Sequence, residues 1–209
     1  MYRLEGLSAV IRELTPSALT ELFAVVTTLG DPVFLVGVVA ALYWLVDDQE
    51  SATRLIGYTL VAIAVTISLK EGLALPRPPA DVRAVAVESG SGGFPSGHAI
   101  GATVVYGGSV LLFDRLRTPR TAAVVTALVA LVSLSRVVIG VHYLGDVVAG
   151  VAVGAAILGV VRSVGEPRFV YLLAALAVVP GMVVTGGEVE TIFVFGAGVG
   201  ASAVAFLTC

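Results

Sequence analysis

Residues 121–139 read TAAVVTALVALVSLSRVVI, and residues 141–161 read VHYLGDVVAGVAVGAAILGVV. Each stretch is about as long as the roughly 20 apolar residues that a helix needs to cross the hydrocarbon core of a bilayer. The first holds one charged side chain, Arg136, and the second holds one, Asp146. Two consecutive stretches of this kind are typical of an integral membrane protein, so we expect two membrane-spanning helices here.

Apolar stretches on both sides have the same character. We expect further spans over 32–46, 52–69, 95–113, 169–184 and 191–207, which charged or turn-forming residues separate. Residues 17–29 are also apolar but too short to cross, so we interpret 5–29 as a helix lying in the membrane surface. The sequence predicts an all-α polytopic membrane protein, a single domain over 1–209, with an amino-terminal interfacial helix and about six transmembrane helices drawn from these seven apolar stretches.

The composition supports this class and excludes others. Charged residues make up 13% of the 209 residues, against roughly 25% in soluble proteins, and hydrophobic residues make up 57%. Mean hydropathy is +1.01. Twelve basic residues against fifteen acidic ones give a net charge of −3 without a basic block, which excludes a nucleic-acid partner.

Three clusters of polar residues stand out from this apolar background. They are Lys70 to Pro78 (KEGLALPRP), Phe94 to His98 (FPSGH) and Ser135 to Asp146. Because successive spans alternate in direction, all three clusters are predicted to lie on the same face of the membrane. A binding or catalytic site is therefore expected at that face.

The basic residues of these clusters predict an anion site. Lys70, Arg77 and Arg136 are three cations with little competing carboxylate, and a phosphate group is the simplest anion that needs all three. Gly97 follows Ser96 at a predicted helix start, where a missing side chain would let backbone N–H groups approach the anion closely.

The two histidines of the chain fit phosphoryl transfer. His142 and Asp146 are four residues apart, hence on one face of a helix, and the carboxylate can keep one imidazole nitrogen protonated while the other attacks. His98, on another helix, is then available as a general acid. Because the cations can neutralise the phosphate oxygens, we expect neither a metal ion nor a cofactor.

The patterns Lys-x6-Arg-Pro, Pro-Ser-Gly-His and Ser-Arg-x5-His-x3-Asp resemble the three signature motifs of the type 2 phosphatidic acid phosphatase superfamily. All three are present in the right order within a motif core over 70–146, roughly a third of the chain. The resemblance implies a six-helix membrane core built around a phosphatase site. Soluble relatives share this pocket, but the hydropathy of the chain argues against that branch.

The resemblance also implies a role for each motif residue. His142 is the expected nucleophile, forming a phosphohistidine, Asp146 orients it and His98 protonates the leaving group. The expected phosphate ligands are Lys70, Arg77, Ser96, Gly97 and Arg136. The implied substrate is a lipid phosphate or diphosphate in the bilayer: polyprenyl diphosphate first, then phosphatidic acid or phosphatidylglycerophosphate.

Basic residues in the loops predict the sidedness. One face carries six arginines in the loops 47–54, 114–120 and 162–168, and the other carries at most six basic residues. Setting aside the three cations assigned to phosphate leaves six against three, which favours the first face as cytoplasmic. We therefore expect a multi-pass protein of the cell membrane whose site is extracytoplasmic.

Several alternatives remain open from the sequence. Lys70 could place its ammonium group at the membrane surface without a chemical role, and Arg136 and Asp146 could form a purely structural ion pair. The same site could serve a phosphotransferase that uses another acceptor than water. A non-catalytic lipid transporter is a third possibility. The sequence makes no prediction of oligomeric state.

Overall fold

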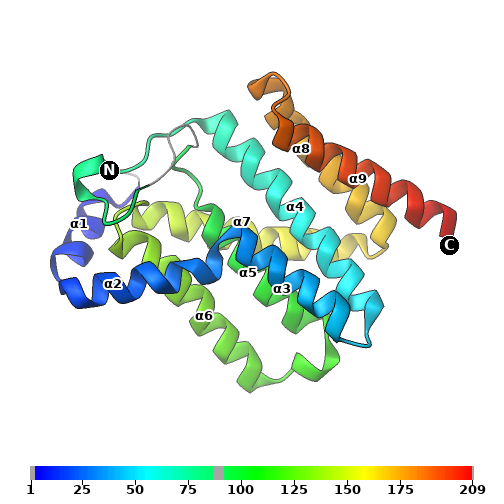
Figure 1. The fold of residues 1–209 in the computed structure, drawn as a ribbon, viewed down its shortest axis with the longest axis horizontal. Coiled ribbons are helices and arrows are strands. Elements are labelled where there is room, and N and C mark those ends of the chain that lie inside the picture. Colours follow the sequence, from blue (N-terminus) through cyan, green and yellow to red (C-terminus); the bar gives the residue numbers. More distant parts are fainter. Residues whose placement is uncertain (1–2, 87–91, 209) are drawn as a thin grey trace.

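The computed structural model describes residues 3–86 and 92–208, and all regular elements in these ranges are helices. Residues 87–91, in the predicted polar loop after the second span, lie outside the described part. Figure 1 shows the helices as one bundle, with α1 and α2 at one end and the α8–α9 pair along one side. The α-helices are α1 (Glu5–Glu13), α2 (Ser17–Val26), α3 (Pro32–Leu45), α4 (Gln49–Leu73), α5 (Gly97–Leu112), α6 (Pro119–Val138), α7 (Leu144–Val164), α8 (Pro167–Thr185) and α9 (Val189–Thr208), and short 3-10 turns are η1 (Thr27–Gly30), η2 (Ala80–Val82) and η3 (Asp114–Leu116).

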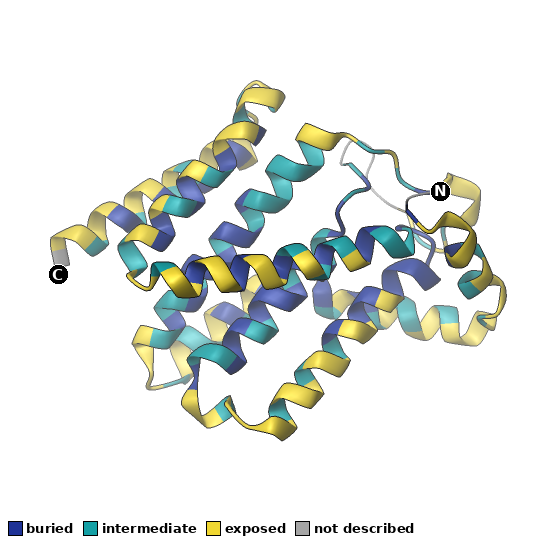
Figure 2. Cartoon of the chain, turned by 180° about the vertical axis from the view of Figure 1, so that it is seen from behind, coloured by how far each residue is buried: buried dark blue, intermediate teal, exposed yellow. Residues whose placement is uncertain are grey.

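The long helices have the length and composition of membrane spans. Among the described residues, α4, α6, α7, α8 and α9 are long and apolar enough to cross a bilayer, and a bent pair of α2–η1 with α3 would make a sixth span. Large apolar side chains stay exposed along their outer faces (Figure 2), where lipid rather than water satisfies them. The predicted all-α membrane protein with about six spans is confirmed.

The amino-terminal third differs from the prediction in detail. Residues 5–29 do not form one surface helix: the chain turns at Leu14–Pro16, and α2–η1 then meets α3 at an angle of 50°. Asp31 and Pro32 explain this break, because the Asp31 carboxylate accepts the Val33 N–H and so starts a new helix. The predicted spans over 32–46 and 95–113 correspond to short helices, α3 with 14 residues and α5 with 16.

The core lies where α4, α5, α7 and α8 meet. Its largest buried cluster includes Tyr58 of α4, Ile100 of α5 and Val161 of α7, all nearly inaccessible. Gly150 and Gly154 let α5 and α7 approach closely, since a Cβ on Gly150 would lie 2.7 Å from the Ser96 carbonyl oxygen. The two glycines are therefore helix-packing positions, and the contact at Gly150 ties the start of α5 to α7.

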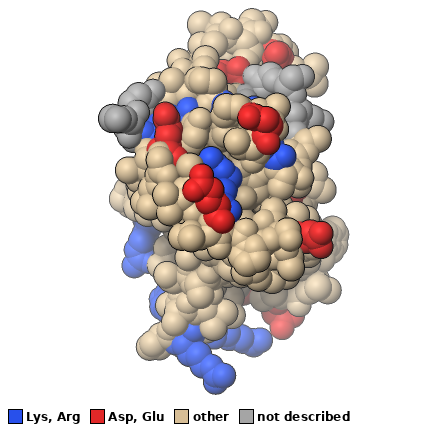
Figure 3. Space-filling model, turned by 90° about the vertical axis from the view of Figure 1, so that its left-hand side faces the viewer, with Lys and Arg blue, Asp and Glu red and all other residues tan. Residues whose placement is uncertain are grey.

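The end of the molecule that carries α1 is mostly uncharged at its surface. Figure 3 views this end and shows basic and acidic side chains near the middle of the face and basic ones at its lower edge. The long loop between α4 and α5 lies at the same end (Figure 1), as do the last turn of α6 and the first turn of α7. All three polar clusters of the sequence therefore meet here.

Candidate phosphate site

A cavity of about 840 Å³ lies between α3, α4 and α9 and reaches the motif residues. Six of the eight predicted site residues line it: Lys70, Arg77, Gly97, His98, Arg136 and His142. The structure thus brings together residues that are up to 72 positions apart in the sequence. Away from these residues, the wall is mainly apolar, and the carboxylates Asp31 and Glu190 also line it. The apolar side chains are Leu35, Val36, Leu60, Ile63, Ile67, Phe193 and Val194.

The apolar part of the cavity follows one side of α4. Thr59, Ile63, Thr66 and Lys70 line it at spacings of three and four residues, which places them on a single helical stripe. The eleven residue steps from Thr59 to Lys70 correspond to about 16 Å of helix. One end of this groove is cationic, and the rest is suited to a hydrocarbon chain.

The three predicted cations come from three different elements. Lys70 is on the last turn of α4, Arg77 is in the loop that follows, and Arg136 is on the last turn of α6. Burial, with the Arg83 charge adding to it, lowers the pKa of Arg77 from its ordinary value. Such crowding of like charges against one cavity favours an anionic occupant.

Arg136 is held rigidly and keeps part of its guanidinium free of protein partners. Its Nη1 donates to the Thr27 hydroxyl at 2.6 Å, and within the described part of the chain its buried Nε has no hydrogen-bond partner. Buried donors are normally paired, so this one is a natural contact for an anion in the cavity. The alternative of an Arg136–Asp146 ion pair is wrong, since the two side chains have other partners.

Ser96 and Gly97 form the start of α5 beside Lys70. The Ser96 N–H donates to the Asp146 carbonyl at 3.0 Å, and its buried hydroxyl has no partner among the described residues. A Cβ on Gly97 would lie 3.0 Å from a methyl of Thr66 and 4.0 Å from the Lys70 ammonium nitrogen. The first N–H groups of α5 therefore lie close to the cationic end of the cavity.

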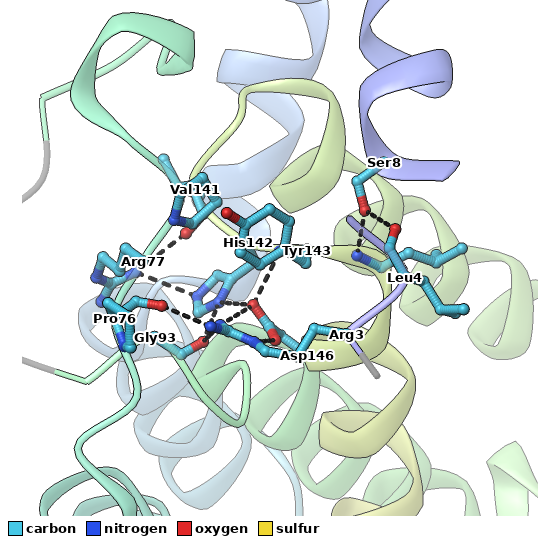
Figure 4. Close-up of polar contacts among 12 residues, drawn as sticks. Arg3, Leu4, Ser8, Pro76, Arg77, Gly93, Val141, His142, Tyr143 and Asp146 are labelled. Atoms are coloured by element: carbon cyan, nitrogen blue, oxygen red, sulfur yellow. Dashed lines mark hydrogen bonds and ion pairs between the residues drawn. The ribbon is translucent and has the colours of Figure 1, made fainter. Parts of the chain in front are cut away.

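The protonation pattern of His142 follows from its neighbours (Figure 4). Its Nε2 lies 3.2 Å from Nη1 of Arg77, which can only donate, so Nε2 is the acceptor. The proton is then on Nδ1, which lies 2.8 Å from the Gly93 carbonyl and 3.4 Å from Oδ2 of Asp146. This tautomer leaves a lone pair on the nitrogen that faces Arg77 and the cavity.

His142 does not lie on α7, as the spacing argument predicted, but in the connection before it. Gly140, at a φ of 76°, ends α6, and the N–H groups of Val141 and His142 fold back onto the Arg136 carbonyl. No larger residue fits at Gly140, since a Cβ there would meet the Val82 carbonyl at 2.0 Å. The Gly93 carbonyl, which the sequence did not suggest, is the nearer acceptor for Nδ1.

Burial determines the charge state of His142, which is 1% exposed. Burial, opposed by the bond to Asp146 and reinforced by the charges of Arg136, Arg77 and Lys70, lowers its pKa to about 4. The imidazole is therefore neutral near pH 7, which is the state that a nucleophile requires. His98 lines the cavity from the first turn of α5, a separate element, and packs against Gly30.

Asp146 has a partner that sequence reasoning missed. Arg3 donates from Nε to Oδ1 at 2.6 Å and from Nη2 to Oδ2 at 2.7 Å, and both side chains are buried. No motif spacing relates Arg3 to the rest of the site; the one signal was a charge in the apolar amino-terminal run. Within the described residues, no group of three or more potential metal-ligating side chains occurs.

A profile of the PAP2 superfamily matches residues 51–169. The chain belongs to the PAP2 superfamily. The match contains all eight predicted site residues and leaves Arg3 outside it. The predicted family is therefore confirmed, and the motif residues are those of a PAP2 protein.

Known PAP2 proteins resemble the chain in sequence and in fold. Over 109 residues it is 39% identical to the decaprenylphosphoryl-5-phosphoribose phosphatase of Mycobacterium tuberculosis, a match covering 52% of this chain and 58% of that relative's length. The PAP2 phosphatidylglycerolphosphate phosphatase from Bacillus subtilis has a similar fold, with a TM-score of 0.66 and 24% identity over 78% of this chain and 84% of that one. LpxE of Aquifex aeolicus also has a similar fold, with a TM-score of 0.60 and 19% identity over 76% of this chain and 93% of that one.

Proposed function

We propose that this PAP2 protein is an integral-membrane lipid phosphatase that hydrolyses a lipid phosphate or diphosphate through a phosphohistidine. The cavity is the observation that carries this proposal. Its cationic end holds both histidines, and its remaining wall is mainly apolar along the stretch of α4 that precedes Lys70. A phosphorylated headgroup and its hydrocarbon chain fit these two parts in one binding mode.

A polyprenyl-linked phosphate is the substrate class we favour. The relative with 39% identity is named for a decaprenyl-linked phosphoribose, whereas the phosphatidylglycerolphosphate phosphatase shares 24% identity. The match covers 52% of this chain and 58% of that relative's length. Phosphatidic acid and phosphatidylglycerophosphate are the next candidates.

In the proposed mechanism, Nε2 of His142 attacks phosphorus while Nδ1–H stays bonded to the Gly93 carbonyl and Asp146. The bond from phosphorus to the lipid oxygen breaks, and His98 donates the proton that this oxygen needs. Lys70, Arg77 and Arg136 stabilise the negative charge on the phosphoryl oxygens. His98 then takes a proton from water, which attacks the phosphohistidine, releases phosphate and restores His142.

Phosphate release from purified protein tests this proposal. The panel contains polyprenyl diphosphate, a polyprenyl-linked sugar phosphate, phosphatidic acid and phosphatidylglycerophosphate, each in detergent micelles with a metal chelator. We expect release from at least the polyprenyl substrates, loss of release in His142→Ala and strong loss in His98→Ala. Full activity of His142→Ala would disprove the phosphohistidine step.

Two other functions are distinguished by the same samples. A phosphotransferase would yield a phosphorylated acceptor in place of free phosphate, so both products are measured. A transporter would move lipid between the leaflets of a vesicle, and its His142→Ala variant would remain competent. Flux with unchanged histidine variants, and without phosphate release, would favour the transporter.

We also propose that the site faces the extracytoplasmic side, on the basis of the loop arginines. Ala80, exposed in the loop between α4 and α5, offers a position to test this. With Cys209 replaced by Ser, Ala80→Cys should react with a membrane-impermeant maleimide in intact cells. A cysteine at Arg115, in the loop between α5 and α6, should react only after permeabilisation, and the reverse pattern would invert the assigned orientation.

A further inference from the structure

Arg3 is a buried arginine whose side-chain partners, among the described residues, lie in or next to the three polar clusters. It is 4% exposed, and its guanidinium donates to both carboxylate oxygens of Asp146, at 2.6 and 2.7 Å. It also donates to the Pro76 carbonyl at 2.6 Å and to the Gly93 carbonyl at 3.3 Å. A planar guanidinium bound in this two-pronged way fixes both the position and the orientation of a carboxylate.

These contacts join the three polar clusters through one side chain. Pro76 precedes Arg77, Gly93 precedes the Phe94–His98 cluster, and Asp146 ends the third. Figure 4 shows Arg3 lying between Asp146 and the two loop carbonyls. The side chain thus sets the distance between the loop that carries Arg77 and the helix that carries Asp146.

Arg3 and His142 share two acceptors. Nδ1 of His142 faces the Gly93 carbonyl at 2.8 Å and Oδ2 of Asp146 at 3.4 Å, and Nη2 of Arg3 donates to both of these oxygens. Oδ2 receives a further bond from the Tyr143 N–H at 2.8 Å. The guanidinium therefore holds in place the two groups that keep the His142 proton on Nδ1.

The segment around Arg3 is docked specifically on the start of α7. The Gly145 N–H donates to the Arg3 carbonyl at 3.0 Å, and the Leu144 N–H donates to the Ser8 hydroxyl at 2.8 Å. The Arg3 guanidinium also lies over the Tyr143 ring, 4.8 Å from its centroid. A Cβ on Gly145 would lie 2.8 Å from the Arg3 backbone, so the close approach depends on this glycine.

We infer that Arg3 is a positioning residue of the phosphatase site, which acts by holding Asp146 and the Gly93 carbonyl against Nδ1 of His142. This inference rests on the proposed function, since it assigns Arg3 a part in the reaction of His142. Arg3 lies outside the residues matched by the family profile, so it adds an element from the amino-terminal segment to the motif core.

The test compares kcat and KM for phosphate release from polyprenyl diphosphate in detergent micelles. Arg3→Ala should lower kcat roughly 10- to 100-fold, the range seen when a metal-bound histidine loses its supporting partner, and should leave KM within about threefold. Arg3→Lys keeps the charge and one donor and should recover part of kcat. Arg12→Ala, on the same amino-terminal segment but away from the site, should match the wild type.

A double variant separates positioning from a general structural effect. If Arg3 acts through Asp146 and the Gly93 carbonyl, then Arg3→Ala combined with Asp146→Asn should lose less kcat than the product of the two single losses. Multiplicative losses in the double variant, or wild-type kcat in a folded Arg3→Ala protein, would overturn the inference while leaving the proposed function intact. A wild-type protein without phosphate release from any lipid of the panel would overturn both.

Discussion

Arg136→Lys tests the contact between the guanidinium and the phosphate. The substitution keeps a positive charge but removes the planar fork, the bond to the Thr27 hydroxyl and the buried Nε that has no partner among the described residues. Loss of one hydrogen bond to a charged group costs about 1.5–3 kcal/mol. Applied to the transition state, this predicts a fall in kcat/KM of roughly 10- to 150-fold.

The assay is phosphate release from polyprenyl diphosphate, with the inhibition constant of orthovanadate measured in parallel. In Arg136→Lys, kcat/KM for phosphate release should fall and the inhibition constant of orthovanadate should rise, because orthovanadate occupies the position of the phosphoryl group. The control is Arg115→Lys, which makes the same exchange in an exposed turn far from the cavity. If Arg136→Lys stays within about threefold of the wild type, or if Arg115→Lys falls equally, Arg136 does not bind the phosphate.

Three further predictions concern the groove, the nucleophile and the helix packing. Ile63→Trp should fill the apolar part of the cavity, so it should slow turnover of a long polyprenyl substrate more than turnover of a short water-soluble phosphate ester. Val183→Trp, at an exposed position of α8, should change neither turnover rate. Burial holds the pKa of His142 near 4, below the ordinary 6.5. Below pH 6.5 the unfolded chain therefore binds a proton that the folded one does not, and stability falls by about 1.6 kcal/mol between pH 6.5 and 5. His142→Gln should therefore show a flatter dependence of Tm on pH in detergent than the wild type, and equal slopes would contradict the assignment. Gly150→Leu should overpack the contact between α5 and α7, which costs about 1–3 kcal/mol of stability, and should therefore lower both Tm and activity. Gly159→Leu, on the same helix, should be tolerated because a Cβ there meets nothing within 4 Å. Equal Tm values for the two variants would disprove the close α5–α7 contact.

The sequence was sufficient for the family and for most of the fold, because bilayer spans and the three motifs are local patterns. Each long apolar run had to become a helix, since lipid offers no other partner for backbone groups. The sequence did not predict how the helices of residues 5–45 are arranged. Whether α2–η1 and α3 form one bent pair depends on how they pack on α5 and α6, which no property of residues 5–45 alone determines.

Two parts of the site depended on contacts between distant segments. The Gly93 carbonyl is a backbone group, and every residue type carries one, so the sequence gives no signal of its role beside His142. Arg3 is 143 residues from Asp146 and lies just before residues 5–29, the segment that hydropathy assigns to the membrane surface. The motif residues were identifiable because they recur at fixed spacings, whereas these two partners are set only by the folded arrangement.

The hydrogen bond between Arg77 and Nε2 of His142 has a consequence for selectivity. The Arg77 guanidinium donates to the Nε2 lone pair that would attack phosphorus. An incoming phosphoryl group attracts this guanidinium more strongly than imidazole does. A neutral ester has no charge with which to draw Arg77 away, so it meets a blocked nucleophile. In the proposed mechanism, the negative charge of the substrate thus draws Arg77 away from Nε2 of His142. Binding the phosphoryl group and freeing the nucleophile then occur in the same step.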